Sequence, residues 1–324
     1  MDVKRKVVID CDPGIDDCFA LLLCIRHLDV KGIVAVGGNA GLENTQRNAR
    51  YITQLTNRMD IPVYAGYDMP MFSKPERAPE VHGAGGLGSV EIPEPEKQLE
   101  KQHGVDYLID TFMKHDDISL ITLGPLTNVA QAILKEPKLK DRIPEILCMG
   151  GSAFVGNATP VAEFNIYADP EAAKIVFESG IPMQMVGLNV TRQNRLGMED
   201  VAKLDEIGGP VADFASELLK FAVGVFGVSN MCDSTAVSWW VDDRIITKSI
   251  RTQVTVETKG EFTRGMTICD WRNYMGPDPS VDISRERMLG YYEQNANVDV
   301  AMEFDQKRFR EVLFETMEWY KNHL

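Results

Sequence analysis

The 324-residue chain carries 48 acidic against 34 basic side chains, and its net charge of −14 disfavours nucleic acid and anionic membranes as partners. Hydrophobic residues make up 44% of the chain and charged residues 25%, which is typical of a globular protein with an ample core. No apolar run approaches the ~20 residues that span a bilayer. The six cysteines form no C-x-x-C pair and lie mostly in apolar surroundings, so we expect reduced thiols and a cytoplasmic location.

Short apolar runs alternate with longer amphipathic segments along the chain. In chain order, the pattern predicts strands at 7–9, 32–36, 61–64, 120–123, 146–149 and 182–186, and helices at 17–27, 43–55 and 170–179. A helical, aromatic-rich region at 210–240 follows, then strands at 253–257 and 298–304 and a terminal helix from about residue 307. This rhythm predicts an α/β fold with an open, mostly parallel central sheet, helices on both faces, and a single domain over residues 1–324.

Residues 67–95 interrupt the alternation. They are rich in Pro, Gly and Glu and contain the stretch HGAGGLG. A connection of this length is either disordered or a functional lid, and we expect it to lie beside the site and to close over a ligand.

The most informative stretch is DCDPGIDD at residues 10–17, which places Asp10, Asp12, Asp16 and Asp17 between two apolar runs. Buried carboxylates are normally paired or bound to a metal, and oxygen ligands suit Ca²⁺ or Mg²⁺. One alternative is that a single Asp caps the following helix and the others are solvated. Two enzyme classes fit the motif: a Mg²⁺-dependent phosphotransferase, or a hydrolase that binds Ca²⁺ and a polyhydroxylated substrate. The Pro-Gly turn followed by two aspartates favours the hydrolase.

Other polar loops follow predicted strands and should gather at the same edge of the sheet, where ligands bind in α/β folds. Asn39 follows two glycines, and by itself could be a turn residue. Thr127 and Asn128 follow another strand, and we expect them to cap the helix behind them. Glu163 and Asn165 flank a phenylalanine and could equally belong to a solvated loop.

Five segments together resemble the inosine-uridine preferring nucleoside hydrolase family. They are DCDPGIDD, VGGNAGLENTQRNA, LGPLTNVA, MGGSAFVGNATPVAEFNIYADPEAA and CDSTA, and the resemblance extends along most of the chain. It implies a Rossmann-like nucleoside hydrolase fold and Ca²⁺-dependent hydrolysis of the N-glycosidic bond of ribonucleosides to free base and ribose. The partner is then a small ribonucleoside, and we expect a homodimer or homotetramer.

The resemblance also assigns roles to individual residues. It implies that Ca²⁺ is held by the side chains of Asp12, Asp17 and Asp233 and by the backbone carbonyl of Leu123. A larger set binds the substrate: Asp16, Asn39, Asn165 and Asp233 at the 2′ and 3′ positions, Asn157 and Glu163 at the 5′-hydroxyl, and His82 near the base. Asp12 takes a proton from the attacking water, so the expected catalytic residues are Asp12, Asn165 and Cys232, with Asp10 behind the ligands.

Cys232 departs from the majority pattern of the family, in which a His precedes the last metal-binding Asp and protonates the leaving base. A thiol is a weaker donor with an ordinary pKa of ~8.5, yet it serves as a general acid when it is buried and protonated. A subgroup of the family has Cys here. The alternatives are that Cys232 only fills space, or that the chain is a metal-dependent ribosyl-ligand binding protein with little or no turnover.

The base side of the site is less readable, and the sequence leaves purine or pyrimidine preference open. The aromatic candidates are Phe226, Trp239, Trp240, Trp271 and Tyr274. The two adjacent tryptophans are expected in the core or at a subunit interface.

Overall fold

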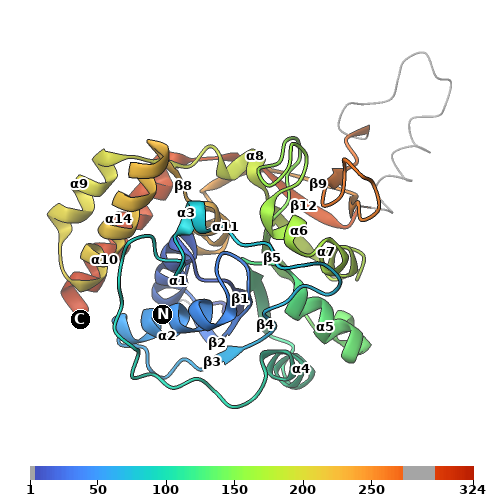
Figure 1. Ribbon diagram of the computed structural model, residues 1–324, viewed down its shortest axis with the longest axis horizontal. Helices are drawn as coiled ribbons and strands as arrows, with labels where there is room; N and C mark the ends of the chain where they lie inside the picture. The colour runs from blue at the N-terminus through green and yellow to red at the C-terminus, as the bar shows by residue number, and fades with distance from the viewer. Residues whose placement is uncertain (1–3, 273–295) are drawn as a thin grey trace.

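A computed structural model describes residues 4–272 and 296–324, and its centre is an eight-stranded sheet with the order β3-β2-β1-β4-β5-β6-β12-β9 (Figure 1). The strands are β1 (Lys6–Cys11), β2 (Asp29–Ala35), β3 (Val63–Ala65), β4 (Ile118–Thr122), β5 (Ile146–Met149), β6 (Met183–Val186), β9 (Ile246–Thr252) and β12 (Val298–Phe304). All neighbours pair in parallel except β9, which runs antiparallel to β12. The predicted open, mostly parallel α/β sheet is confirmed.

Helices connect and cover these strands. The longer ones are α1 (Ile15–His27), α2 (Leu42–Leu55), α4 (Gly104–Lys114), α5 (Thr127–Lys135), α7 (Pro170–Phe177), α9 (Met198–Ile207), α10 (Pro210–Phe226), α11 (Cys232–Val241) and α14 (Gln306–His323). Short helices are α3 (Pro79–His82), η1 (Pro137–Asp141), α6 (Phe164–Ala168) and α8 (Leu188–Thr191). Two small antiparallel pairs, β7 (Arg195–Leu196) with β8 (Ser229–Asn230) and β10 (Val254–Val256) with β11 (Thr267–Cys269), lie outside the main sheet.

The sheet divides the apolar interior into two cores because successive side chains of a strand point to opposite faces. On β1, Val7 and Ile9 join the core formed with α1, α2, α9, α10, α11 and α14, whereas Val8 joins the core formed with α4, α5 and α7. Figure 1 shows α9, α10 and α14 gathered on the left and α4, α5 and α7 on the right. Strands buried on both faces read as continuous apolar runs, and this is why the sequence predicts them well.

Two strands depart from the sequence-based expectation. The run predicted as a strand at 253–257 forms β10, which pairs with β11 and not with the central sheet. The edge strand β9 was not predicted, because most of its side chains are exposed and its residues show no apolar alternation. The helix α4 was also not predicted from the alternation of apolar and amphipathic segments.

The segment 67–95 is held by hydrogen bonds to distant parts of the chain. The backbone N–H of Met71 donates to Asp169 Oδ2 at 2.9 Å, and that of Ala78 donates to the carbonyl of Asn39 at 3.2 Å. The segment is therefore ordered and lies beside the site. Of the two expectations for it, disorder is wrong. Closure over a ligand stays a prediction.

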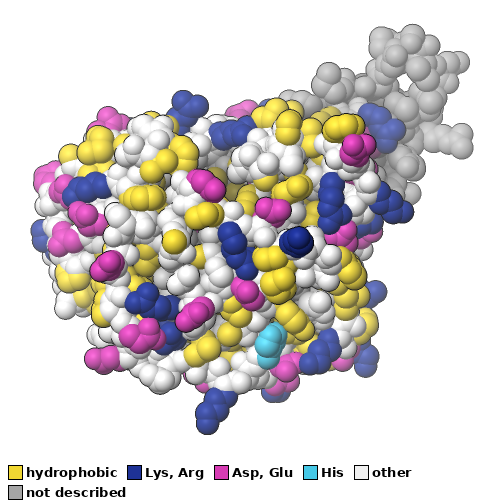
Figure 2. Space-filling model, viewed as in Figure 1, with side chains coloured by type: hydrophobic (Ala, Val, Ile, Leu, Met, Phe, Trp, Pro, Cys, Tyr) yellow, Lys and Arg dark blue, Asp and Glu magenta, His cyan; other side chains and the backbone are white. Residues whose placement is uncertain are grey.

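No helix within the described ranges is both long and apolar enough to cross a membrane. On the face shown in Figure 2, Lys and Arg side chains are interspersed with Asp and Glu, and no basic patch dominates it.

Candidate active site

The loops that follow the carboxyl ends of the parallel strands surround a cavity of about 470 Å³. Every expected substrate-binding residue lines it, together with Cys232 and with Leu123, which was expected on the metal: Asp16, Asn39, His82, Leu123, Asn157, Glu163, Asn165, Cys232 and Asp233. Residues far apart in sequence meet here because parallel strands end at one edge of the sheet. Asp12 and Asp17 lie fully buried close to these residues.

Asp12 follows β1, and its carboxylate is closely enclosed by backbone. Oδ2 accepts a hydrogen bond from the backbone N–H of Asn39 at 2.6 Å, whereas the buried Oδ1 has no partner among the described residues. A Cβ at Gly38 would lie 2.0 Å from Asp12 Oδ2, and one at Gly124 would lie 2.5 Å from Oδ1. Only glycine therefore fits on either side of this carboxylate.

Asn39 joins the two aspartates that flank the turn. Its side-chain amide donates to the Asp12 carbonyl at 3.2 Å and to Asp17 Oδ2 at 3.0 Å. Asp17 Oδ2 also accepts from the backbone N–H of Gly14 at 3.0 Å, at the start of α1. Asn39 is thus more than a turn residue, and Asp17 both caps α1 and keeps a second oxygen, Oδ1, without a partner among the described residues.

The aspartates form a group of the kind that holds a cation. Carboxylate oxygens of Asp16, Asp17 and Asp233 lie within 4.8 Å of one another. Each of these residues, like Asp12, has a buried Oδ1 that no described residue satisfies. Such orphaned carboxylate oxygens are costly unless a cation binds them, and an all-oxygen set suits a hard divalent cation. The chain's own residues therefore fit a metal ion.

The observed group differs from the expected ligand set in two respects. Asp16, expected on the ribose, completes the compact trio, whereas Asp12 contributes an unpartnered oxygen beside it. The carbonyl of Leu123, expected on the metal, accepts a hydrogen bond from the side-chain amide of Asn165 at 2.7 Å.

Burial and mutual repulsion shift these carboxyl groups toward the protonated form. Burial, followed by the charge of Asp16, raises the pKa of Asp17 to about 7. The pKa values of Asp12 and Asp233 are also raised, again mainly by burial and then by neighbouring aspartates. A bound cation would reverse this shift by favouring the ionised carboxylates.

Glu163 and Asn165 are buried, with 2% and 5% of their surfaces exposed, so they do not belong to a solvated loop. Glu163 precedes α6, and its carboxylate accepts from three backbone N–H groups, those of Gly151 and Asn165 at 2.9 Å and that of Ile166 at 3.2 Å. Burial nevertheless raises the pKa of Glu163 to about 7. These bonds hold the carboxylate in one orientation at the cavity wall.

Asn157 lies at the exposed rim of the cavity. Its side-chain oxygen accepts from the backbone N–H groups of Ala158 at 2.8 Å and Phe164 at 2.9 Å. The side-chain amide nitrogen has no such loop contact among the described residues, so it is free to donate to a ligand.

His82 and Cys232 both line the cavity. The backbone N–H of Ile15 donates to His82 Nδ1 at 3.1 Å, which leaves the proton of the neutral ring on Nε2. Burial lowers the pKa of His82, so the ring is neutral at pH 7. Cys232 donates through its thiol to Thr191 Oγ1 at 3.4 Å, and burial raises its pKa. The thiol is therefore protonated at neutral pH, as a general acid requires.

The expectation that Thr127 and Asn128 cap α5 is wrong. Thr127 donates through its hydroxyl to Asp169 Oδ2 at 2.7 Å. Asn128 donates to Asp10 Oδ2 at 2.8 Å and accepts from the backbone N–H of Tyr67 at 2.8 Å. A buried Asp10 needs a donor, but the chain position of that donor could not be read from the sequence.

Of the aromatic candidates for the base that the structure describes, only Phe226 lines the cavity, and 55% of its surface is exposed. Trp239, Trp240 and Trp271 are not among the lining residues. Tyr274 lies outside the described residues. Sequence reasoning missed Arg192, which follows α8 and lines the same cavity.

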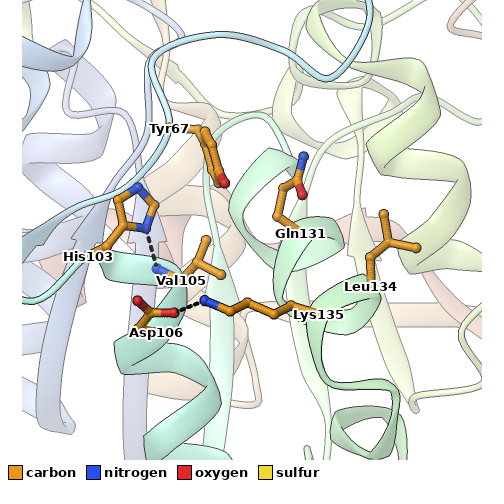
Figure 3. Close-up of a pocket in the computed structure, with 7 residues that line it drawn as sticks. All are labelled: Tyr67, His103, Val105, Asp106, Gln131, Leu134 and Lys135. Atoms are coloured by element: carbon orange, nitrogen blue, oxygen red, sulfur yellow. Dashed lines mark hydrogen bonds and ion pairs between the residues drawn. The ribbon is translucent and has the colours of Figure 1, made fainter.

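A second cavity, of about 480 Å³, lies between the beginning of α4 and the helix α5 (Figure 3). Its lining consists of Tyr67, His103, Val105, Asp106, Gln131, Leu134 and Lys135. The dashed lines in Figure 3 mark the bond from Val105 N–H to His103 Nδ1 and the ion pair of Lys135 with Asp106. None of the residues expected at the active site lies in it.

Comparisons with known proteins agree with the geometry. The profile of the inosine-uridine preferring nucleoside hydrolase family matches residues 7–311. The pyrimidine-specific ribonucleoside hydrolase RihA of Escherichia coli strain K12 is 38% identical over 295 residues, which are 86% of this chain and 94% of the relative.

Solved structures give the same result. The purine-preferring ribonucleoside hydrolase from Gardnerella vaginalis has a TM-score of 0.87 and 28% identity, covering 99% of this chain and 100% of the other. A plant nucleoside hydrolase, PpNRh1, has a TM-score of 0.87 and 27% identity, covering 97% of this chain and 99% of the other.

The α/β sheet with an acidic cluster at its carboxyl edge defines a metal-binding hydrolase site. The chain belongs to the inosine-uridine preferring nucleoside hydrolase family and is an N-glycosyl hydrolase.

Proposed function

We propose that this protein hydrolyses the N-glycosidic bond of ribonucleosides with a bound Ca²⁺, releasing free base and ribose. The observation that carries the proposal is the set of buried oxygens of Asp12, Asp16, Asp17 and Asp233 that no described residue satisfies, beside a polar cavity. Several carboxylates on loops favour Ca²⁺ over Mg²⁺, which requires a stricter octahedral geometry. The alternative of a ribosyl-ligand binding protein without turnover is less well supported, because no expected polar residue is missing.

The chain's own residues can carry the steps of this reaction. When bound, Ca²⁺ supplies positive charge that orients the ribose hydroxyls and increases the acidity of the attacking water. Asp12, whose Oδ1 has no partner within residues 4–272 and 296–324, is placed to accept a proton from that water. The carboxylates around the sugar favour the positive charge that develops at C1′ as the bond to the base breaks.

Glu163, Asn165 and Asn157 are proposed to hold the ribose. The backbone bonds of Glu163 fix its carboxylate for the 5′-hydroxyl, and the rim amide of Asn157 can donate to the same group. Asn165 is anchored by its bond to the carbonyl of Leu123, which follows β4, the strand that pairs with β1.

Pyrimidine ribonucleosides are the proposed substrates. RihA, which is named as pyrimidine-specific, is 38% identical to this chain, whereas the purine-preferring enzyme from Gardnerella vaginalis is 28% identical. A cavity of about 470 Å³ has the volume of an ordinary small-molecule site.

The test is the release of ribose from uridine, inosine, 2′-deoxyuridine and p-nitrophenyl riboside, before and after chelation and with Ca²⁺ restored. We expect turnover of uridine that disappears on chelation and returns with Ca²⁺. The 2′-deoxynucleoside should react far more slowly, because it leaves buried polar groups unpaired. The control is Asp12→Asn, which should lose about 10²-fold or more.

Two outcomes would contradict the proposal in different ways. Turnover that is unaffected by chelation would show that the reaction does not depend on Ca²⁺. Calorimetric binding of ribose without release of ribose from any substrate would favour the binding-protein alternative, and turnover of p-nitrophenyl riboside alone would mean that the base is not activated.

We also propose a homodimer or homotetramer in a cytoplasmic location. The six cysteines are all free thiols, and four of them are buried, which supports a reducing compartment. Sedimentation equilibrium tests the assembly, and a monomer at micromolar concentration would contradict it.

A further inference from the structure

Arg192 is a cation in the active-site cavity for which the proposed steps have no use. It follows α8 directly, is partly buried and lines the cavity together with Cys232. Its Nη2 donates to the carbonyl of Gly156 at 2.7 Å. Within residues 4–272 and 296–324, no carboxylate forms an ion pair with this guanidinium, and Gly156 is the sole acceptor of its hydrogen bonds. A guanidinium has five N–H donors, so most of its donors remain available.

The surroundings of Arg192 make this charge unusual. The other ionisable groups on the described cavity lining include the carboxylates of Asp16, Glu163 and Asp233, whereas His82 is neutral because burial lowers its pKa. Arg192 is therefore the one lining residue in the described ranges with a permanent positive charge. It attracts anions to a cavity whose remaining groups repel them.

Arg192 is next in sequence to the residue that binds the Cys232 thiol. Thr191, its neighbour in sequence, accepts the hydrogen bond of the Cys232 thiol at 3.4 Å. The resemblance to the nucleoside hydrolase family implies that the departing base lies at Cys232, and Arg192 lines the same cavity as this residue.

We propose that Arg192 binds the departing base and stabilises the negative charge that the base gains as the C1′–N bond breaks. This inference rests on the proposed function and deepens it. The electron pair of the breaking bond goes to the ring nitrogen, and the oxygen of water forms the new bond to C1′. The proton of that water goes to Asp12 and from there to solvent, and the anionic base takes a proton from solvent on release.

The chemistry of the guanidinium selects a class of base. Its planar donors match a pair of adjacent acceptors, as they do in bidentate contacts with carboxylates. In a 2-oxopyrimidine, the glycosidic nitrogen is next to a ring carbonyl, so the charge that develops there is shared with an exposed oxygen. The glycosidic nitrogen of a purine has no adjacent carbonyl. Arg192 therefore favours 2-oxopyrimidine nucleosides.

The competing role for Arg192 is purely structural, as a clamp on the loop at Gly156. Two substitutions separate the roles. Arg192→Lys keeps the charge but loses the planar donors, whereas Arg192→Gln removes the charge and keeps polar atoms. A clamp alone would affect all ligands equally, whereas a charge that binds the base would affect anionic ligands selectively.

The first measurement is calorimetric and needs no turnover. Uracil and barbiturate have similar shapes, but barbiturate is an anion at pH 7. We expect the unsubstituted protein to bind barbiturate about tenfold more tightly than uracil. Arg192→Gln should reduce this ratio to about one, and Arg192→Lys should keep most of it. Equal affinities for the two ligands in the unsubstituted protein, or a ratio unchanged by Arg192→Gln, would overturn the proposal.

The second measurement varies the leaving group. Arg192→Gln should slow uridine hydrolysis by about 10²-fold but slow 5-fluorouridine less, because fluorine already stabilises the anionic base. Equal losses on both would overturn the role of Arg192. Tighter binding of ribose 5-phosphate than of ribose, lost in Arg192→Gln, would put the guanidinium on the 5′ side and also overturn it. Failure of the unsubstituted protein to release ribose would instead contradict the proposed function. The ratio of the barbiturate and uracil affinities would still test the role of Arg192, because it needs no turnover.

Discussion

Asn128 shows how a single buried side chain organises the acidic site. Its amide nitrogen donates to Asp10 Oδ2 at 2.8 Å, and its oxygen accepts from the backbone N–H of Tyr67 at 2.8 Å. A Cβ at Gly66 would lie 2.2 Å from the Asn128 side chain, so this carboxamide is enclosed on the Tyr67 side as well. Asp10 is fully buried, and burial raises its pKa to about 7 although the Asn128 bond opposes that shift.

We predict that Asn128→Ala destabilises the protein by about 2–4 kcal/mol, because it leaves the buried Asp10 Oδ2 and the partly buried Tyr67 N–H without their Asn128 partner. Urea unfolding of the metal-free protein measures the change. The matched control is Gln102→Ala, an amide on the surface that should change the free energy of unfolding by less than about 0.5 kcal/mol. If the two substitutions cost the same, Asn128 has no such role.

At the scale of elements, two segments border the cavity and differ in how they are held. In the segment that contains α3, the backbone N–H of His82 donates to the carbonyl of Ala78 at 2.9 Å, and that of Gly88 donates to the carbonyl of His82 at 2.7 Å. At the end of α10, Phe226 and Val228 are 55% and 40% exposed. Local openings are easiest where few contacts are buried, so the second segment should open first.

Hydrogen exchange tests this difference. We predict that amides of residues 226–231 exchange faster than those of residues 78–88 in the metal-free protein. Addition of Ca²⁺ with ribose should slow exchange most at 226–231, because closure there would exclude water from the ligand. Equal slow exchange in both segments, unchanged by ligand, would contradict closure.

At the scale of the whole molecule, stability is expected to depend on pH through buried carboxyl groups. Burial raises the pKa values of Asp10, Asp17 and Glu163 to about 7 in the folded protein, from ordinary values of 3.8, 3.8 and 4.5. Between the ordinary pKa values and a pH of about 7, the folded state therefore holds more protons than the unfolded state. The stabilising contribution is complete below the unfolded pKa values and is lost as the pH rises toward 7.

We predict that the melting temperature of the metal-free protein falls as the pH rises from about 4.5 to 7. Ca²⁺ should reduce or reverse this slope, because it binds the ionised carboxylates of the folded state. Calorimetric scans with chelator and with Ca²⁺ measure the effect, and a single transition is expected for a single domain. Glu163→Gln should make the melting temperature measured with chelator depend less on pH, because it removes one of the carboxyl groups with a raised pKa. Parallel curves with and without Ca²⁺ would contradict the prediction.

The sequence by itself determined the central strands, because strands buried on both faces are continuous apolar runs such as the one that ends at Asp10. It also determined where the aspartates of residues 10–17 would lie, since they follow the first strand and parallel strands end at one edge. The strand β9 was missed because an exposed edge strand has no apolar pattern.

Only the tertiary structure decided which side chains meet. Asn128 and Asp10 are 118 residues apart, and Asn165 and Leu123 are 42 apart, so no local pattern pairs them. That no described carboxylate pairs with Arg192 became visible only when the residues of the cavity lining were known. Local spacing dictates helices, strands and turns, whereas hydrogen bonds and charges act through space, where the fold sets which residues are neighbours.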